Sequence, residues 1–219
     1  EYFNEYIPAH KDRLKFISNF SGSAGFAILF KNKNYLFVDG RYTTQARIQS
    51  GTKFKIETIP KKFPKNVLKT NKKIIIGFDP KLHTEQQLNY LFKIKNVELK
   101  SLEKNLVDIV WLKKHRATSQ SYYSMPKNMV GDKAEKKILK VRKLLNKNKI
   151  DLLLVTAPEN VAWILNIRGF DSFYSPIPNT RLVISKNGEV FLFADLKKTR
   201  KLHKFLKNKV KILNEIDIN

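Results

Sequence analysis

The hydrophobic positions of the 219-residue chain fall into short runs with two alternating spacings. Runs of strand length alternate with segments in which apolar residues recur every three or four positions. Strands are predicted at 53–59, 73–78, 97–102, 151–156 and 209–213, and helices at 66–70, 84–93 and 132–147. Asp132 is expected to cap the last of these helices. Strands that alternate with helices are typical of an α/β fold with a mixed sheet.

The most informative pattern is one arrangement that occurs in both halves of the chain. Each copy has a short apolar segment, a glycine turn, two strands joined by an Asn-rich turn, and a helix that follows an aspartate. The copies span 16–50, with Asp39, and 163–206, with Asp195. Asn and Gly tolerate the positive φ of tight turns, so each copy predicts a β-hairpin. Two such distant copies indicate two domains of one fold, at 1–110 and 132–219, with 111–131 as a linker.

The two copies have different flanking segments. A helix and a strand precede the second copy at 132–156, whereas only fifteen residues precede the first. Further strands and helices follow the first copy, whereas a single strand follows the second. Because each domain lacks a piece that its sister has, we expect the chain to be part of a longer protein. The first domain would then lack a leading strand within this chain.

Composition narrows the class of protein. The net charge is +24, from 43 Lys and Arg against 19 Asp and Glu, which raises the question of nucleic-acid binding. Lys outnumbers Arg and is scattered, whereas phosphate and base recognition favour Arg, so nucleic acid is the weaker expectation. Without Cys there is no disulfide and no Cys nucleophile. No apolar run approaches the ~18 residues of a membrane span and no secretory signal is seen, so a cytoplasmic protein without membrane contact is expected.

The sequence contains no recognisable catalytic motif. Its four His stand apart, without the spacing of a zinc site. The Ser-Gly-Ser-Ala-Gly run at 21–25 lacks the first glycine of a nucleophile elbow and the Lys-Ser/Thr of a P-loop, so a close-packed turn is expected. Asp39 and Asp195 would hold Mg²⁺ only if the two domains brought them together, so helix capping is favoured for each.

Two polar turns remain as candidate contact sites. Arg41 follows a strand end, where α/β folds place ligand-binding loops. Its guanidinium suits a carboxylate or a carbonyl, and a structural ion pair is the alternative. In the matching turn of the second copy, Arg168 and Asp171 are close enough in sequence to pair, and turn architecture is favoured there.

Four segments occur in a familiar order and spacing: Phe20-Ser-Gly-Ser-Ala-Gly25, Asp39-Gly-Arg-Tyr42, Glu103-Lys-Asn-Leu-Val-Asp108 with Trp111, and Ala162-Trp-Ile-Leu-Asn-Ile-Arg-Gly169. Over nearly the whole chain they resemble the N-terminal half of cytosolic-type Xaa-Pro aminopeptidases. The resemblance implies two tandem creatinase N-terminal-type domains with a ribonuclease H-like fold. Each would be a mixed β-sheet flanked by helices.

In that family a C-terminal domain holds two divalent metal ions, usually manganese, through two Asp, one His and two Glu. It removes an N-terminal residue that precedes proline, and the enzyme is typically a homodimer. The resemblance therefore implies that this chain is the non-catalytic part, inactive alone, with no catalytic or metal-binding residue. Its expected partners are short peptides with proline at the second position and its own C-terminal catalytic domain. Its expected roles are substrate access, substrate positioning and dimerisation.

One residue role follows from the same resemblance. In the family the Arg of the Asp-Gly-Arg-Tyr motif reaches the substrate peptide across the domain boundary, which implies substrate binding by Arg41. Two other functions stay open, namely a catalytically inactive peptide- or histone-binding module of the same fold and a basic nucleic-acid-binding domain. The presence or absence of the five metal ligands in the downstream sequence would separate the enzyme from the inactive module.

Overall fold

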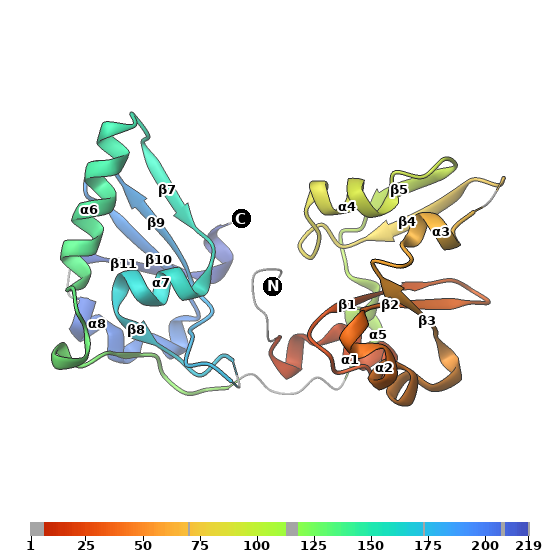
Figure 1. Ribbon diagram of the computed structural model, residues 1–219. Helices are drawn as coiled ribbons and strands as arrows, with labels where there is room; N and C mark the ends of the chain where they lie inside the picture. The colour runs from red at the N-terminus through yellow and green to blue at the C-terminus, as the bar shows by residue number, and fades with distance from the viewer. Residues whose placement is uncertain (1–6, 70, 113–117, 173, 207–208, 219) are drawn as a thin grey trace. The chain divides into compact units, whose positions relative to one another are not determined.

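The chain forms two compact units, residues 1–115 and 116–219, each with its own sheet and apolar core (Figure 1). The computed structural model describes the chain except residues 1–6, 70, 113–117, 173, 207–208 and 219.

A three-stranded sheet and a separate strand pair form the first unit. Its strands are β1 (Gly25–Leu29), β2 (Asn34–Asp39), β3 (Lys55–Ile59), β4 (Ile74–Phe78) and β5 (Val97–Ser101). Its helices are α1 (Arg13–Ser18), α2 (Thr43–Ser50), α3 (Pro64–Val67), α4 (Glu85–Phe92) and α5 (Leu106–Val110). The sheet order is β1-β2-β3, with β1 antiparallel and β3 parallel to β2, and β4 pairs with β5 in parallel.

Strand β2 is buried on both of its faces because successive side chains point to opposite sides of a sheet. Tyr35 and Phe37 belong to an apolar cluster with α3 and α4. Leu36 and Val38 belong to a second cluster, with residues of α1 and α2. The helices therefore cover both faces of the sheet, and the end of β2 is held rigidly between them.

A four-stranded sheet and a separate two-stranded ladder form the second unit. Its strands are β6 (Tyr123–Ser124), β7 (Leu152–Val155), β8 (Ile167–Arg168), β9 (Arg181–Ser185), β10 (Val190–Ala194) and β11 (Lys211–Asn214). Its helices are α6 (Ala134–Lys147), α7 (Pro158–Leu165) and α8 (Arg200–Leu206). The sheet order is β11-β10-β9-β7, in which only the β10–β11 pairing is parallel, and β6 pairs with β8 in a separate short ladder.

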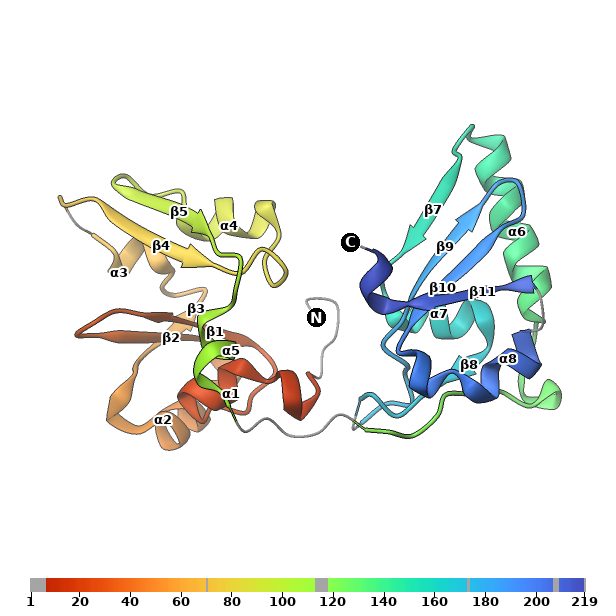
Figure 2. The same cartoon turned by 180° about the vertical axis from the view of Figure 1, so that it is seen from behind.

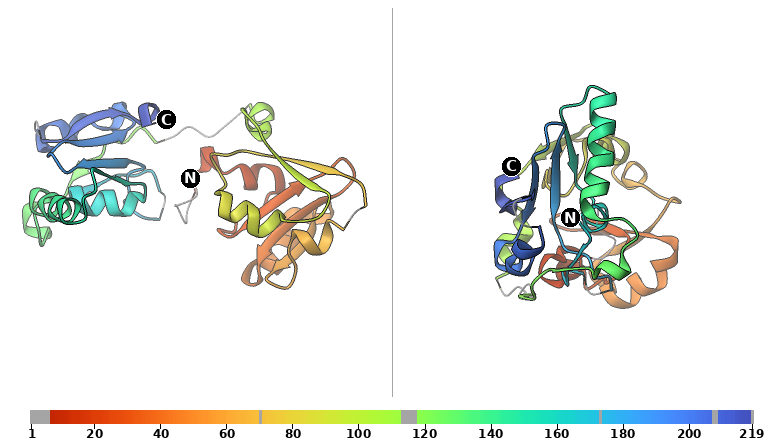
Figure 3. Two further views of the ribbon diagram at one scale, coloured as in Figure 1. Left: turned by 90° about the horizontal axis from the view of Figure 1, so that it is seen from above. Right: turned by 90° about the vertical axis from the view of Figure 1, so that its left-hand side faces the viewer.

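Helices α6 and α7 cover one face of this sheet, as the opposite views in Figures 1 and 2 show. Figure 3 shows α6 running along the strands. Leu182, Ile184 and Leu192 are fully buried in the shared core, together with Leu165 of α7. This packing explains why α6 needs the apolar stripe that the sequence shows.

The two units repeat one arrangement. In each, an antiparallel hairpin (β1–β2 or β9–β10) is followed by a parallel strand (β3 or β11) on the far side of its second strand. Both predicted hairpins and the α/β fold class with mixed sheets are therefore confirmed. The second unit adds β7 beside β9, whereas the first adds the β4–β5 pair.

The structure assigns the apolar segments that begin at 16 and 163, for which the sequence predicted neither helix nor strand, in part to helices α1 and α7. Helix α7 begins at Pro158, a residue suited to the first helical position. One local prediction needs correction. Asp132 does not cap α6, because Lys133 is the N-cap residue. The Asp132 carboxylate is instead engaged by Lys136 at 2.6 Å and by Lys140 at 2.8 Å. These two ion pairs lower the pKa of Asp132 to about 2.

Part of the predicted linker at 111–131 is ordered within the second unit. Tyr122 is buried in that unit's core, and Tyr123–Ser124 form β6. Residues 113–117, also in the predicted linker, lie outside the described residues.

Candidate functional site

The loop after β2 presents Arg41 on a fixed backbone. The Asp39 carboxylate accepts hydrogen bonds from the Arg41 backbone N–H and from Arg41 Nε, both at 2.9 Å. The side-chain bond is the larger cause, and the backbone bond the second, of a lowered Asp39 pKa. The Arg41 side chain is nevertheless 76% exposed. The structure thus shows the ion pair that was one alternative for Arg41, while ligand contact stays a prediction.

The glycine turn at 21–25 packs directly under this loop. A Cβ on Gly22 would clash with the rings of Phe20 and Tyr42, and one on Gly25 would lie 2.9 Å from the Phe37 carbonyl oxygen. The Ser23 and Tyr42 hydroxyls are hydrogen-bonded at 3.0 Å. The close-packed turn expected for this run is confirmed, and it supports the residue next to Arg41.

The arrangement suits binding more than catalysis. A guanidinium offers planar donors to a carbonyl or a carboxylate, and the Arg41 backbone is fixed by the Asp39 cap. The site can therefore hold a hydrogen-bond acceptor group in place.

In the second unit, the predicted proximity of Arg168 to Asp171 does not produce an ion pair. Arg168 Nη1 donates to the carbonyl oxygens of Ala162 and Ile167. Asn166 ends helix α7 in the left-handed conformation, with φ of 54°. Arg168 therefore adds side-chain hydrogen bonds at the C-terminus of α7 and in the turn after it, and the expected turn architecture holds without that ion pair.

Asp171 instead anchors three separate segments. Its carboxylate accepts hydrogen bonds from the Tyr122 hydroxyl at 2.6 Å, Lys198 Nζ at 2.6 Å and the Asn179 backbone N–H at 2.7 Å. Burial, and next the Asp171 charge, raise the pKa of Tyr122. The group ties the residue before β6, the backbone at Asn179 and the 3₁₀ turn after β10 to one buried carboxylate.

The sequence gave no sign of a second buried lysine in this unit, Lys137. Its Nζ donates to the Trp163 carbonyl and to Asn166 Oδ1, and it lies 4.3 Å from the centre of the Trp163 ring. Burial is the main cause that lowers the Lys137 pKa. A cavity of about 310 Å³ adjoins these side chains and is also lined by Arg168. Both cations hold the C-terminus of α7, so their first role is structural.

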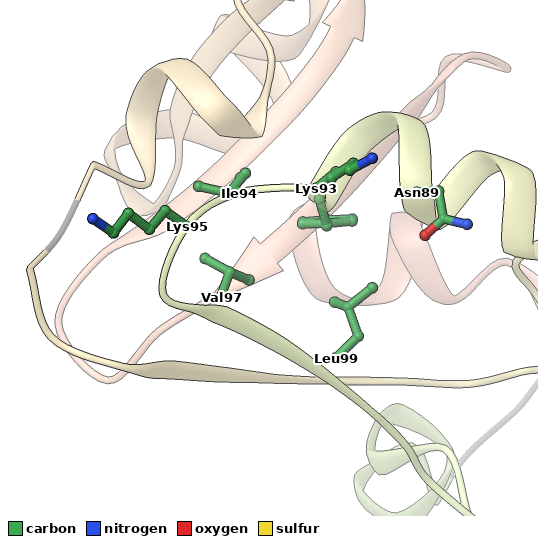
Figure 4. Close-up of a pocket in the computed structure, with 7 residues that line it drawn as sticks. Asn89, Lys93, Ile94, Lys95, Val97 and Leu99 are labelled. Atoms are coloured by element: carbon green, nitrogen blue, oxygen red, sulfur yellow. The ribbon is translucent and has the colours of Figure 1, made fainter.

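The larger hollow of the first unit carries no catalytic group. It has a volume of about 410 Å³ and lies between the end of α4 and β5 (Figure 4). Its lining is mostly aliphatic and amide, with two lysines: Asn89, Phe92, Lys93, Ile94, Lys95, Val97 and Leu99. Neither a carboxylate nor a hydroxyl faces this space, so it offers no acid, base or nucleophile.

Metal binding finds no support in the part of the chain that the structure describes. No three His, Asp or Glu side chains there lie close enough together to hold an ion. Asp39 and Asp195 each cap a 3₁₀ turn in their own unit, by accepting from the N–H groups of Arg41 and Lys197, which confirms the capping role. Among the described helices none is both long and apolar enough to cross a bilayer.

Each of the two units matches a known protein family. Residues 6–110 and 113–218 each match a family model described as the creatinase/prolidase N-terminal domain. Aminopeptidase P1 of Lotus japonicus is 32% identical over 204 residues, which cover 89% of this chain and 30% of that protein. A probable Xaa-Pro aminopeptidase P of Coprinopsis cinerea is 34% identical, covering 90% of this chain and 33% of the relative.

A solved structure matches both units. The X-prolyl aminopeptidase of Caenorhabditis elegans, described as a cytosolic enzyme with a di-nuclear active site, superposes with a TM-score of 0.88 at 29% identity. The match covers 98% of this chain and 37% of that one. The chain thus spans about a third of the length of these relatives.

Proposed function

The chain belongs to the creatinase/prolidase N-terminal domain family, which it matches twice in tandem, and on that premise we propose that it is the non-catalytic N-terminal part of an Xaa-Pro aminopeptidase. The observation that carries the proposal is the agreement of both units, in order, with relatives named for this activity.

Peptide hydrolysis is assigned to a region outside these 219 residues. The intact enzyme would use two divalent ions, manganese being the expected metal, to activate water there. The residues of this chain do not fit such a centre, because the described part offers no set of three ligands. No hydrolytic step is therefore derived for this chain, and we expect it to be inactive alone.

Arg41 is proposed to bind the substrate peptide. Its guanidinium is 76% exposed, while its backbone is fixed by the Asp39 cap and by the glycine turn beneath. Such a group is suited to hold a carbonyl or carboxylate oxygen of a short peptide whose second residue is proline. The ion pair with Asp39 aligns Nε of a side chain that stays 76% exposed.

The other proposed roles concern the assembly. The two units would limit access to the catalytic domain, help to position short peptides and contribute to a homodimer. A cytoplasmic location is proposed as well, in keeping with the C. elegans relative, which is described as cytosolic.

The test uses the longer protein, loaded with Mn²⁺ and given a short Xaa-Pro peptide. Arg41→Ala is expected to raise KM or lower kcat/KM by about tenfold, the effect of one charge-assisted hydrogen bond of ~1.5 kcal/mol. Arg47→Ala is the matched control, because it removes an equally charged exposed side chain from the adjacent helix α2. It is expected to leave the kinetics unchanged.

The possible outcomes separate the competing functions. Equal loss in both variants would reduce Arg41 to a source of general positive charge, and no loss in either would leave these units as scaffold. No hydrolysis by the wild-type protein would instead favour the inactive peptide- or histone-binding module. Binding of nucleic acid with sequence preference and a steep salt dependence would favour the nucleic-acid alternative.

A further inference from the structure

The second unit has a cavity of about 310 Å³ where the segment before α6 meets the C-terminal end of α7. We call it the α7 cavity and define it by six of the side chains that line it: Met125, Met129, Asp132, Lys137, Trp163 and Arg168. The proposed function assigns no role to these six, since it places substrate binding at Arg41 in the other unit. The volume is near the lower end of that of ligand-binding pockets, so one small molecule would fill it.

Two cations line this cavity without a negative partner. Lys137 is only 4% exposed, yet its Nζ donates to two neutral acceptors, the Trp163 carbonyl oxygen and Asn166 Oδ1. Arg168 Nη1 likewise donates to two backbone carbonyl oxygens. Across the part of the chain that the structure describes, no carboxylate forms an ion pair with either side chain. A buried charge is normally paired, so this arrangement favours an anionic ligand.

The end of helix α7 does not balance these two charges. The carbonyl groups at a helix C-terminus amount to about half of one elementary charge, against two full charges on Lys137 and Arg168. Burial is the main cause that lowers the Lys137 pKa, and the nearby Arg168 charge lowers it further. An anion in the cavity would offset both the burial of Lys137 and its repulsion by Arg168.

One negative group lines the same cavity. Asp132 is charged at neutral pH, because its ion pairs with Lys136 and Lys140 lower its pKa to about 2. A carboxylate has about four acceptor positions, so Asp132 can accept a hydrogen bond from a ligand besides those from the two lysines. Its charge also opposes the effect of burial on the Lys137 pKa, which shows that the two groups are near each other.

The apolar part of the lining lies partly at the surface. Trp163 is 61% exposed and Met129 is 67% exposed, although Ala162 and Ile164, the neighbours of Trp163 on α7, are buried. Indole and thioether side chains pack well against apolar groups of varied shape. An apolar group of a ligand that lay against them would be removed from water, which favours binding.

From these observations we infer that the α7 cavity binds one free α-amino acid with an apolar side chain. The ligand carboxylate would accept hydrogen bonds from Lys137 and Arg168. Its ammonium would donate to Asp132, and its side chain would pack against Trp163. Inorganic phosphate suits the cavity less well, because Asp132 would repel a dianion and phosphate has no apolar part. The inference does not rest on the proposed function.

The probe is L-leucine, titrated into the 219-residue chain by isothermal titration calorimetry. A dissociation constant of about 1 mM or tighter is expected, since two charge-assisted hydrogen bonds are sufficient for that affinity. L-Leucinamide lacks the carboxylate and N-acetyl-L-leucine lacks the ammonium, so each should bind at least about tenfold more weakly. Both of these controls leave the protein untouched. Amide NMR shifts on addition of L-leucine should concentrate at residues 125–137 and 163–168.

Three protein variants decide where L-leucine binds. Arg168→Met removes one of the two cations and should weaken binding at least about tenfold. Arg200→Met is its matched control, since it removes an exposed arginine at the start of α8 in the same unit. Asp132→Asn should weaken the binding of L-leucine but not that of N-acetyl-L-leucine, which has no ammonium. Circular dichroism and thermal unfolding establish that each variant is folded.

Each outcome has one meaning. Weaker binding in Arg168→Met and Asp132→Asn, with retention in Arg200→Met, supports the site. Equal affinity for L-leucine and L-leucinamide, equal loss in Arg168→Met and Arg200→Met, tighter binding of inorganic phosphate, or no saturable binding would overturn it. If N-acetyl-L-leucine binds as tightly as L-leucine, the carboxylate alone is recognised and the amino-acid assignment is wrong. The titration involves no hydrolysis by the longer protein, so failure here is distinct from failure of the proposed function.

Discussion

Replacing Lys198 by methionine tests the buried network that closes the second unit. The Lys198 and Asp171 side chains are only 8% and 4% exposed, and their charged atoms are 2.6 Å apart. Methionine keeps much of the aliphatic stem but removes the charge. The substitution therefore leaves the Asp171 carboxylate buried without its cation.

The size of the effect follows from what remains around that carboxylate. Breaking a buried pair by removing one partner costs about 3–5 kcal/mol. The Tyr122 hydroxyl and the Asn179 N–H still donate to Asp171, so the lower end, about 3 kcal/mol, is expected. Lys197→Met, at an exposed neighbouring lysine, should change the free energy of unfolding by less than about 0.5 kcal/mol.

Urea unfolding followed by Trp163 fluorescence measures this free energy. Each unit contains one tryptophan, Trp111 or Trp163, so a Trp111→Phe background restricts the signal to the second unit. A double variant with Asp171→Leu should recover part of the lost stability, because no unpaired charge is then buried. A loss below about 1 kcal/mol for Lys198→Met, or strict additivity in the double variant, would refute the reasoning.

Two further predictions concern pH and packing. Burial raises the pKa of Tyr122 above its ordinary 10.0. The raised pKa contributes stability that is fully present below about pH 10. This contribution falls as the pH rises further, because the tyrosine then ionises in the unfolded chain but not in the folded one. Urea unfolding at pH 9 and 11 should show a larger alkaline loss in wild type than in Tyr122→Phe, and equal losses would contradict this cause. Gly25→Ala should destabilise the first unit by about 1–3 kcal/mol, because its Cβ meets the Phe37 carbonyl oxygen at 2.9 Å. Gly131→Ala, whose Cβ meets nothing within 4 Å, is the thermal-unfolding control, and a similar melting shift in both would argue against the clash.

The hairpins were predictable because their signals are local. The Lys-Asn turns lie between strand-forming runs, and an aspartate follows each second strand. Both features act within a few residues, so they have the same effect in any surroundings. Helix α7 was not predicted, although Pro158 and the acidic Glu159 at its start are local signals of a helix N-terminus.

The local features of the candidate site were predicted from the sequence, whereas its contacts between distant residues were not. The sequence placed Arg41 after the end of a strand and indicated that the turn at 21–25 needs small residues. Both conclusions depend only on residues that are adjacent in the sequence. It did not show that this turn packs under the Arg41 loop, because the Ser23–Tyr42 bond joins segments 19 residues apart. The choice between pairing Asp171 with Arg168 and with Lys198 also depended on distant contacts.

By itself the sequence therefore determined the two-fold repeat, the α/β class, the capping aspartates and the resemblance to the creatinase-type family. Only the tertiary structure decided which charges are buried together, since Asp171 meets Tyr122 and Lys198 across separations of 49 and 27 residues. It alone also showed that, among the described residues, β9 lies between β10 and β7 while β2 lies between β1 and β3. The physical reason is that caps and turns are satisfied within a few residues, whereas burial, ion pairing and strand neighbours depend on how the whole chain packs.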